Sequence, residues 1–460
     1  MRRLGREATL GVTIVGVVLL GLAVELAVGE VRPSAKAVVG GPRFEERALF
    51  CPPGLVDGKS FAVAAPAEDR VSLGLEPARP DRVQLDPGHI FIQELPGSAA
   101  TDVVGYGGPV RAGALVRTQE PIVGEAAARC SDRASSHWFF ASGASTLGVD
   151  ERLMLYNPFP DEAVVRVTFL TETGEERKGG LADIPVPSKS STEIRVENFI
   201  ALERTLAVRI DTKRGRVVAW RMLFDNPEGG PTGVQMSLGA TATSDTWFFP
   251  DGAVGPGVDE RISIMNPGTE EARVNVSLTG DGELIQPEDL VGLEITPGTA
   301  RTISLNDVLK GDQKDLGGVS AVVQSTNGVG IVAERSIRYN TSTVSGSAAE
   351  VGSPRTSTAW LVPAATLNPS TDTIVVMNPG STPAEVSLEL LFDRRAPLSP
   401  EAIQSREVPP GGRLKIGVGQ WTELATAMIR VESTAPVVVE RFSYSAVPDD
   451  VAAVMGFPLE

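Results

Sequence analysis

The sequence has few of the residues on which common catalytic sites depend. Only two histidines, His89 and His137, and two cysteines, Cys51 and Cys130, occur in 460 residues. The patterns H-E-x-x-H, C-x-x-C and G-x-S-x-G do not occur, so three common zinc and serine-hydrolase signatures are missing. The sequence therefore predicts no metal, no cofactor and no catalytic residue, and it leaves any ligand-binding residues unknown.

Positive charge is also scarce. Lys and Arg number 42 against 58 Asp and Glu, which gives a formal net charge of −16. Because nucleic-acid binding needs a basic face, we expect no nucleic-acid partner. Hydrophobic residues make up 42% of the chain, which is enough for a sizeable core, and the length suggests about three or four domains.

The first thirty residues have the pattern of a targeting element. Arg2, Arg3 and Arg6 precede an uncharged run over residues 8–24, which Glu25 interrupts. This run lies between a signal-peptide core of about 7–15 residues and a spanning helix of about 20. We expect a cytoplasmic N-terminus (1–7), a transmembrane signal anchor (8–29) and a linker (30–46), with the bulk outside the cytoplasm. Secretion after signal cleavage is the alternative.

The two cysteines agree with export. Cys51 and Cys130 lie near the two ends of the first segment after the anchor. An even cysteine count in an exported chain favours a disulfide. Two unrelated buried thiols are the alternative.

A motif of about 110 residues recurs along the chain. Each copy has an aromatic run with tryptophan, then in two copies an Asp-Glu-Arg step, then an Asn-Pro turn. The tryptophans are spaced by 109 and 113 residues, and the asparagines by 109 and 112. These residues are Trp138, Trp247 and Trp360, followed by Asn157, Asn266 and Asn378. Because repetition argues for structure rather than a single site, we expect the aromatic runs to fill cores; stacking on carbohydrate is the alternative.

Alternating apolar and polar residues follow each Asn-Pro turn, and Pro/Gly/Ser turns and a hairpin come next. This pattern predicts an all-β fold of tandem immunoglobulin-like antiparallel β-sandwich repeats after the N-terminal transmembrane helix. We expect polar linkers between units, for example over 341–358. The sequence also predicts a degenerate first unit. In its alignment with the fourth unit, Glu125 takes the position of Glu440. The predicted units are 47–134, 137–226, 246–340 and 359–446, with a C-terminal segment at 447–460.

A recurrent arginine in the last strand of each later unit needs a partner, because it alternates with apolar residues. Acids repeat only at the strand that enters the Asn-Pro turn. We predict an intra-unit ion pair in each unit, provided that at least two of the three units bring the groups within about 4 Å. Calcium binding by the acids and glycoside hydrolysis by acid pairs are the alternatives. The arginines are Arg221, Arg335 and Arg441, and the acids are Asp150, Glu151, Asp259, Glu260 and Asp372.

The pattern W-F-F … D-E-R … N-P-G … V-x-E-R resembles repeats of actinobacterial secreted and surface proteins. With its N-terminal anchor and cysteine-bearing first unit, the chain is similar to an actinobacterial family classed as a domain of unknown function. The resemblance implies an envelope location and β-sandwich units, and it brings no catalytic residues. Unit 2 departs from the pattern, since Trp220 stands where Glu334 and Glu440 stand.

We therefore expect a non-catalytic, membrane-anchored scaffold or binding protein of the bacterial cell envelope, with its four sandwiches arranged as a rod. Its expected partners are the cytoplasmic membrane, through the N-terminal helix, and envelope proteins or glycans. An envelope glycan-processing enzyme or a carbohydrate-binding surface protein is the alternative, and a cleft lined by non-repeated polar residues would favour it.

Overall fold

The computed structural model describes residues 46–459, except 54–57, 68, 77–78, 96–99, 229, 281–283, 312, 314–315, 365–370, 423–426 and 447–448. The predicted anchor at 8–29 lies outside these residues. Within the described ranges, no helix is both long and apolar enough to cross a membrane.

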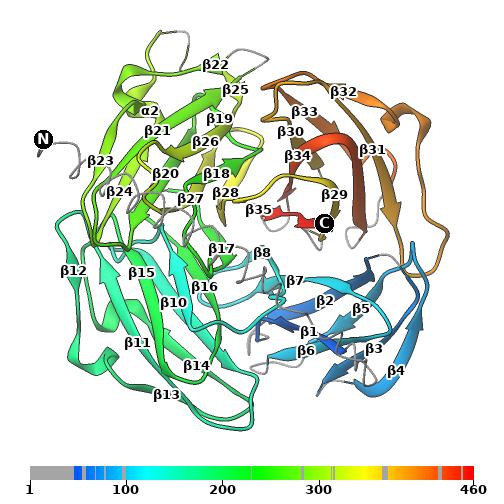
Figure 1. Cartoon of the computed structure of the whole chain (residues 1–460), viewed down its shortest axis with the longest axis horizontal. Coiled ribbons are helices and arrows are strands. Elements are labelled where there is room, and N and C mark those ends of the chain that lie inside the picture. The colour runs from blue at the N-terminus through cyan, green and yellow to red at the C-terminus, as the bar shows by residue number, and fades with distance from the viewer. Residues whose placement is uncertain are drawn as a thin grey trace, which may run out of the picture. The chain divides into compact units, whose positions relative to one another are not determined.

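The described chain is nearly all β, as the sequence predicts, and its strands pair antiparallel. The short helix α2 (Leu305–Val308) interrupts the third unit. The alternation read from the sequence is confirmed, since Val274, Val276 and Leu278 are fully buried and the residues between them are not. Each unit has two groups of strands that enclose an apolar core (Figure 1).

Unit 1 pairs the sheet β1-β6-β3-β4 with the sheet β5-β2-β7-β8. The predicted disulfide is confirmed: Cys51 ends β1, Cys130 follows β8, and their Cα atoms lie 4.3 Å apart. The strands are β1 (Glu46–Cys51), β2 (Gly58–Pro66), β3 (Val71–Glu76), β4 (Arg79–Leu85), β5 (Phe91–Glu94), β6 (Thr101–Tyr106), β7 (Val110–Thr118) and β8 (Gly124–Arg129).

Unit 2 pairs the sheet β14-β10-β16-β17 with the sheet β12-β11-β15-β9, and β13 joins β11. The elements are β9 (His137–Phe140), β10 (Val149–Asn157), β11 (Ala163–Leu170), β12 (Glu175–Glu176), η1 (Gly179–Leu181), β13 (Ile184–Val186), β14 (Ser190–Arg195), η2 (Val196–Asn198), β15 (Ala207–Arg214), β16 (Val218–Asp225) and β17 (Gly233–Leu238).

Unit 3 repeats this plan with the sheets β24-β20-β27-β28 and β18-β26-β21-β22, while β23 joins β21 and β19 pairs with β25. Its strands and 3₁₀ turn are β18 (Thr246–Phe249), β19 (Ala253–Val254), β20 (Val258–Asn266), β21 (Ala272–Thr279), β22 (Leu284–Ile285), η3 (Glu288–Leu290), β23 (Leu293–Ile295), β24 (Thr299–Ser304), β25 (Gly317–Gly318), β26 (Ser320–Ser325), β27 (Val332–Asn340) and β28 (Ser345–Val351).

Unit 4 differs in that one long strand, β34, takes part in both groups of strands. It pairs with β29 and β31 through its first half and with β30 and β35 through its second half. The elements are β29 (Ser357–Val362), β30 (Thr371–Met377), β31 (Ala384–Leu391), η5 (Glu401–Ile403), β32 (Arg406–Val408), β33 (Arg413–Gly417), β34 (Met428–Ala446), β35 (Asp449–Met455) and β36 (Phe457–Pro458).

The repeated motif residues stabilise each of the last three units in the same way. The indole N–H groups of Trp138, Trp247 and Trp360 donate to the carbonyls of Val217, Ile331 and Val437. All three tryptophans are buried, so the prediction that they fill cores is confirmed. The side chains of Asn157, Asn266 and Asn378 each bridge the turn that follows and a neighbouring strand.

The strands β8, β17, β28 and β35, one from each unit, meet at the centre of the view in Figure 1. Each packs against the next, and β35 of unit 4 packs against β8 of unit 1, so the contacts form a closed circuit. The predicted rod is therefore wrong. The predicted linkers are also wrong: β17 and β28 lie within them, and β35 lies within the predicted C-terminal segment.

Strand pairing corrects the alignment of unit 1. Glu334 pairs with Val351 at the end of β28, and Glu440 pairs with Met455 at the end of β35. In unit 1 the corresponding pair is Gly113 with Arg129, so Gly113, and not Glu125, takes the position of Glu440. Unit 1 therefore has no acid at this position.

Candidate functional site

The recurrent arginines are fully buried, but two of the three bind an acid of the next unit rather than of their own. Arg221 of unit 2 pairs with Glu334 of unit 3, and Arg335 of unit 3 pairs with Glu440 of unit 4. Arg441 alone pairs with an acid of its own unit, Asp372, with 2.8 Å between Nε and Oδ1. The predicted intra-unit ion pair thus occurs in one unit of three, and the prediction of a repeated clasp is wrong.

The difference follows from the residue that each arginine meets across the unit boundary. After unit 4 the circuit returns to unit 1, where Gly113 lies against Pro363 and offers no carboxylate. Arg441 therefore binds Asp372, which occupies the position of Glu151 and Glu260. Those two glutamates instead accept the N–H groups of Ala144 and Ala253.

The remaining predicted acids lie outside these clusters. Asp150 pairs with Arg152, with 3.0 Å from Nε to Oδ1, and Asp259 pairs with Arg261, with 2.8 Å from Nη2 to Oδ2. Adjacent strand residues face opposite sides, which separates each aspartate from the buried glutamate beside it. Among the described residues, no group of three or more His, Cys, Asp or Glu side chains is placed to hold a metal ion.

Burial raises the pKa of five carboxyl groups among the described residues: Glu151, Glu260, Glu350, Glu440 and Asp450. Burial raises the pKa of Glu151 to about 7 and that of Glu260 to about 8, although Arg221 and Arg335 oppose the shifts. Burial likewise raises the pKa of Glu350 to about 8, against the positive charge of Arg129. Two buried clusters, one at the boundary of units 2 and 3 and one at the boundary of units 3 and 4, therefore hold one arginine and two acids each, and burial favours the neutral form of Glu151 and Glu260.

One aspartate joins all four units. The two carboxyl oxygens of Asp450 accept the backbone N–H groups of Glu125, Val234, Ser347 and Val451, at 3.1, 3.0, 3.3 and 2.8 Å. The other central strands have Gly124, Gly233 and Gly346 at the corresponding place. A Cβ atom on Gly124 or Gly346 would lie 2.5 Å from an Asp450 oxygen. The glycines make room for a single carboxylate at the start of the four strands.

At the other end of these strands lies a central cavity of about 630 Å³. The segments that follow the four central strands line it, so every unit contributes: Cys130–Arg133, Leu238–Ser244, Val351–Arg355 and Phe457–Leu459, together with Arg111, Arg129, Trp138 and Trp247. This volume is in the range of cavities that hold small organic ligands, about 300–1,000 Å³.

The central cavity is positively charged within a negatively charged chain. Four arginines (Arg111, Arg129, Arg133, Arg355) and one acid, Asp132, line it. Arg111 and Arg129 lie 5.9 and 6.0 Å from the centre of the Phe457 ring. Burial alone would raise the pKa of Asp132, but its bond to Arg133 and the charges of Arg111 and Arg129 outweigh burial and lower it.

Two of these arginines have unused donors. The Nε of Arg129 is buried without a hydrogen-bond partner, although its Nη2 lies 3.3 Å from Glu350. The exposed side chain of Arg355 makes no ion pair or hydrogen bond to any residue that the structure describes. An anionic group that entered the cavity would meet the exposed guanidinium of Arg355, whose donors are free to bind it.

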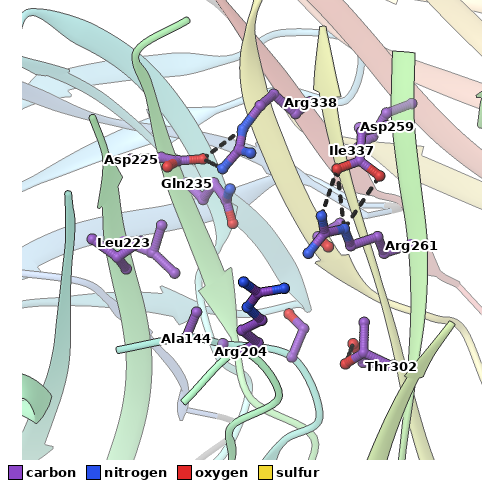
Figure 2. A pocket seen from close by; sticks show the side chains of 15 residues that line it. Ala144, Arg204, Leu223, Asp225, Gln235, Asp259, Arg261, Thr302, Ile337 and Arg338 are labelled. Atoms are coloured by element: carbon purple, nitrogen blue, oxygen red, sulfur yellow. Dashed lines mark hydrogen bonds and ion pairs between the residues drawn. The ribbon is translucent and has the colours of Figure 1, made fainter. Parts of the chain in front are cut away.

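A second, smaller cavity lies at the boundary of units 2 and 3 and has a volume of about 80 Å³ (Figure 2). We call it the boundary pocket. Arg338 binds Asp225 and Arg261 binds Asp259, while Figure 2 shows Arg204 pointing into the space between Gln235 and Arg261. The uncharged lining residues are Ser142, Gly143, Ala144, Val149, Leu223, Gln235, Ser263, Thr302, Ser336 and Ile337.

Neither cavity could be found from the sequence, because both combine residues of several units. The motif analysis compared units with one another and so missed residues that face a neighbouring unit. One signal was present: Gly124 and Gly346 each begin a short stretch rich in small residues, G-E-A-A-A and G-S-A-A. Asp450 begins the corresponding stretch of unit 4, D-V-A-A, with an acid where the other units have glycine.

These features define a class of protein: an all-β chain of four two-sheet units in a closed circuit, with a basic central cavity. Residues 107–314 match a family of unknown function (DUF5719), as the sequence resemblance implies at that level. No curated protein matches the chain. A crystal structure of Thermotoga maritima 1070 is similar to 24% of this chain, which corresponds to 95% of that chain, with 18% identity and a TM-score of 0.21.

Proposed function

We propose that this chain is a non-catalytic, membrane-anchored binding protein or scaffold of the bacterial cell envelope, with four tandem immunoglobulin-like units outside the cytoplasm. The arginines and the apolar run of residues 1–29 support an anchored, exported chain. The disulfide of unit 1 supports an oxidising compartment. The two-sheet plan of each unit supports the immunoglobulin-like description.

One observation carries the proposed binding role: the central cavity gathers four arginines and one aspartate from a chain of net charge −16. A local concentration of positive charge against the sign of the whole protein attracts anions. Phe457 and Leu459 add apolar surface beside the arginines. The ligand of this site is therefore an anionic envelope component whose apolar part contacts Phe457.

The ion pairs between units support a site of fixed shape. Arg221–Glu334 and Arg335–Glu440 cross two unit boundaries, and Asp450 binds all four units. A cavity that four units build together needs them to be held in place, because loosely placed side chains bind weakly. In this role the buried charges hold the site together and do no chemistry.

Photocrosslinking from the cavity wall tests the binding role. A photoreactive residue replaces the exposed Thr243 in the full-length chain, which is then incubated with separated envelope lipids, glycans and proteins. We expect an anionic component to be captured, and Arg355→Glu to abolish the capture. Arg195→Glu, a charge reversal on the exposed end of β14, is the matched control and should leave the capture unchanged.

Two results would contradict the proposal. Capture that Arg355→Glu does not change would place the ligand elsewhere, and cleavage of a glycan fraction by the purified chain would favour the enzyme.

The intact mass of the chain from membranes tests the anchor, because signal cleavage would remove the residues up to about position 29.

A further inference from the structure

The boundary pocket exists because unit 3 lacks aromatic side chains that unit 4 has at the same positions. Counted from the buried arginines, Ser336 corresponds to Phe442 and Arg338 corresponds to Tyr444. On the other side of the boundary, Asp225 corresponds to Tyr339. At the boundary of units 3 and 4, these aromatic residues pack into one apolar cluster with Ile337 and Val451.

Aromatic side chains thus fill this place at the boundary of units 3 and 4, whereas a pocket occupies it at the boundary of units 2 and 3. Tyr339 and Phe442 lie with their ring centres 5.5 Å apart where the boundary pocket has Asp225 and Ser336. A hollow at a boundary forfeits packing energy unless something occupies it. Charged side chains line the hollow beside apolar ones such as Leu223 and Ile337, so a purely apolar occupant would leave those charges without a partner.

The charges of the boundary pocket select an anion. Three arginines and two aspartates line it, which leaves one positive charge in excess. Each aspartate already binds an arginine, Asp225 to Arg338 and Asp259 to Arg261. Arg204 is the third cation, and its side chain has no hydrogen-bond or ion-pair partner in the described ranges. Its guanidinium points into the hollow (Figure 2).

Size then narrows the class of anion. A volume of about 80 Å³ suits one small oxyanion and is well below the roughly 300 Å³ at which ligand cavities begin. Guanidinium groups pair well with phosphate oxygens because their N–H fork matches them. Gln235, Ser336 and Thr302 supply neutral donors around the same space. We propose that the boundary pocket binds a single phosphate group, either free or at the end of a larger molecule.

This site goes beyond the proposed function, since it shares no lining residue with the central cavity. A phosphate there would contact Arg204 of unit 2 together with Arg261 and Arg338 of unit 3. It would therefore bind two units at once and raise the thermal stability of the chain when present.

The test measures phosphate binding to the full-length chain by calorimetry at fixed ionic strength. We expect inorganic phosphate to bind with one site per chain. Arg204→Gln should weaken binding about tenfold, the order expected for one lost charge-assisted hydrogen bond. Ser336→Phe copies the residue that fills the next boundary, so it should abolish binding. Arg301→Gln is the matched control, because Arg301 is exposed and adjacent to Thr302 but points to the other face of β24.

Two further ligands, glycerol 3-phosphate and acetate, test where the phosphate group comes from and whether another anion binds as well. Glycerol 3-phosphate that binds as well as phosphate would indicate a terminal phosphate on a larger molecule, and exclusion of it would indicate the free ion. Equal binding of acetate would overturn the choice of phosphate, and so would unchanged binding by both Arg204→Gln and Ser336→Phe. Arg355→Gln should have no effect, so failure of this site is separable from failure of the central one. Far-ultraviolet circular dichroism confirms that each variant is folded.

Discussion

Arg335 of unit 3 binds Glu440 of unit 4 through both nitrogens of its fork, with 2.6 Å from Nη2 to Oε1 and 3.2 Å from Nη1 to Oε2. Both side chains are at most 1% exposed. The N–H group of Asp251 also donates to Glu440, at 3.1 Å. The boundary of units 2 and 3 repeats this arrangement with Arg221, Glu334 and the N–H group of Ser142.

Removing one partner of this pair should be costly. Glu440→Gln leaves the Arg335 guanidinium buried against a neutral amide, so we expect the free energy of unfolding to fall by about 3–5 kcal/mol. Urea denaturation of the full-length chain, followed by tryptophan fluorescence, measures the loss.

The matched comparison is an exposed pair. Lys310→Met breaks the contact of Lys310 with Asp289 and should change the unfolding free energy by less than about 1 kcal/mol. The double variant Arg335→Met with Glu440→Met should recover most of the loss, because it leaves no unpaired charge. A Glu440→Gln variant within about 1 kcal/mol of the natural chain would show that the pair does not stabilise the boundary.

The free energy of unfolding should fall as pH rises. Carboxylates that are paired at the surface have the opposite effect, because their lowered pKa values make stability rise with pH. The folded pKa values of Glu151, Glu260 and Glu350 are raised to about 7, 8 and 8. Between the unfolded value near 4.5 and these values, the folded chain holds more protons than the unfolded chain. Their stabilising contribution is therefore full below about pH 4.5 and is lost as pH rises through 7 to 8.

Urea unfolding at pH 5.5, 7 and 8.5 measures this dependence, with a slope of up to about 1.4 kcal/mol per pH unit for each group. The triple variant Glu151→Gln, Glu260→Gln and Glu350→Gln should reduce the slope, because the amides do not titrate, while Glu440 and Asp450, whose pKa values are also raised, retain part of it. Glu288→Gln, an exposed carboxyl on η3, is the control and should leave the slope unchanged. A natural chain that gains stability from pH 5.5 to 8.5 would contradict the shifts.

Loss of the disulfide should destabilise unit 1. The bond closes a loop with a sequence separation of 79, for which chain entropy gives about 4 kcal/mol. We expect Cys51→Ser with Cys130→Ser to lower the unfolding free energy by a similar amount. Because Cys130 lines the central cavity, the same variant should also reduce capture in the crosslinking assay. Dithiothreitol treatment of the natural chain should reproduce both effects and should leave the double variant unchanged.

The content of each unit was readable from the sequence. Period-2 alternation after Asn266 and Asn378 predicted strands that the structure contains, and the even number of cysteines favoured the disulfide that it shows. The strand signal is local, because side chains alternate between the two faces of a sheet and burial of one face therefore requires an apolar residue at every second position.

The arrangement of the units relative to one another could not be predicted from the sequence. The predicted partner of Arg221 was an acid of the same unit, whereas Glu334 lies 113 positions away in the next unit. The polar residues of 341–358 suggested a linker, whereas the structure places Ala348 and Ala349 of this stretch in a buried strand. The pockets could not be predicted for the same reason. Arg204 belongs to unit 2 and Arg338 to unit 3, and a comparison of repeats does not reveal which residues of two units line one pocket.

The last prediction concerns Asp450, which accepts four backbone N–H groups with two carboxyl oxygens. Burial raises its pKa well above the ordinary value, against these four donors, which lower it. Asp450→Asn keeps the shape but replaces one oxygen by an NH₂ group that faces N–H donors, so we expect a loss of about 2–4 kcal/mol in urea unfolding. Gly233→Ala should also destabilise, because its Cβ would lie 2.5 Å from the Ser347 nitrogen. Asp449→Asn, at the exposed neighbouring position, should change little. An Asp450→Asn chain as stable as the natural one would mean that the four units are held together without this carboxylate.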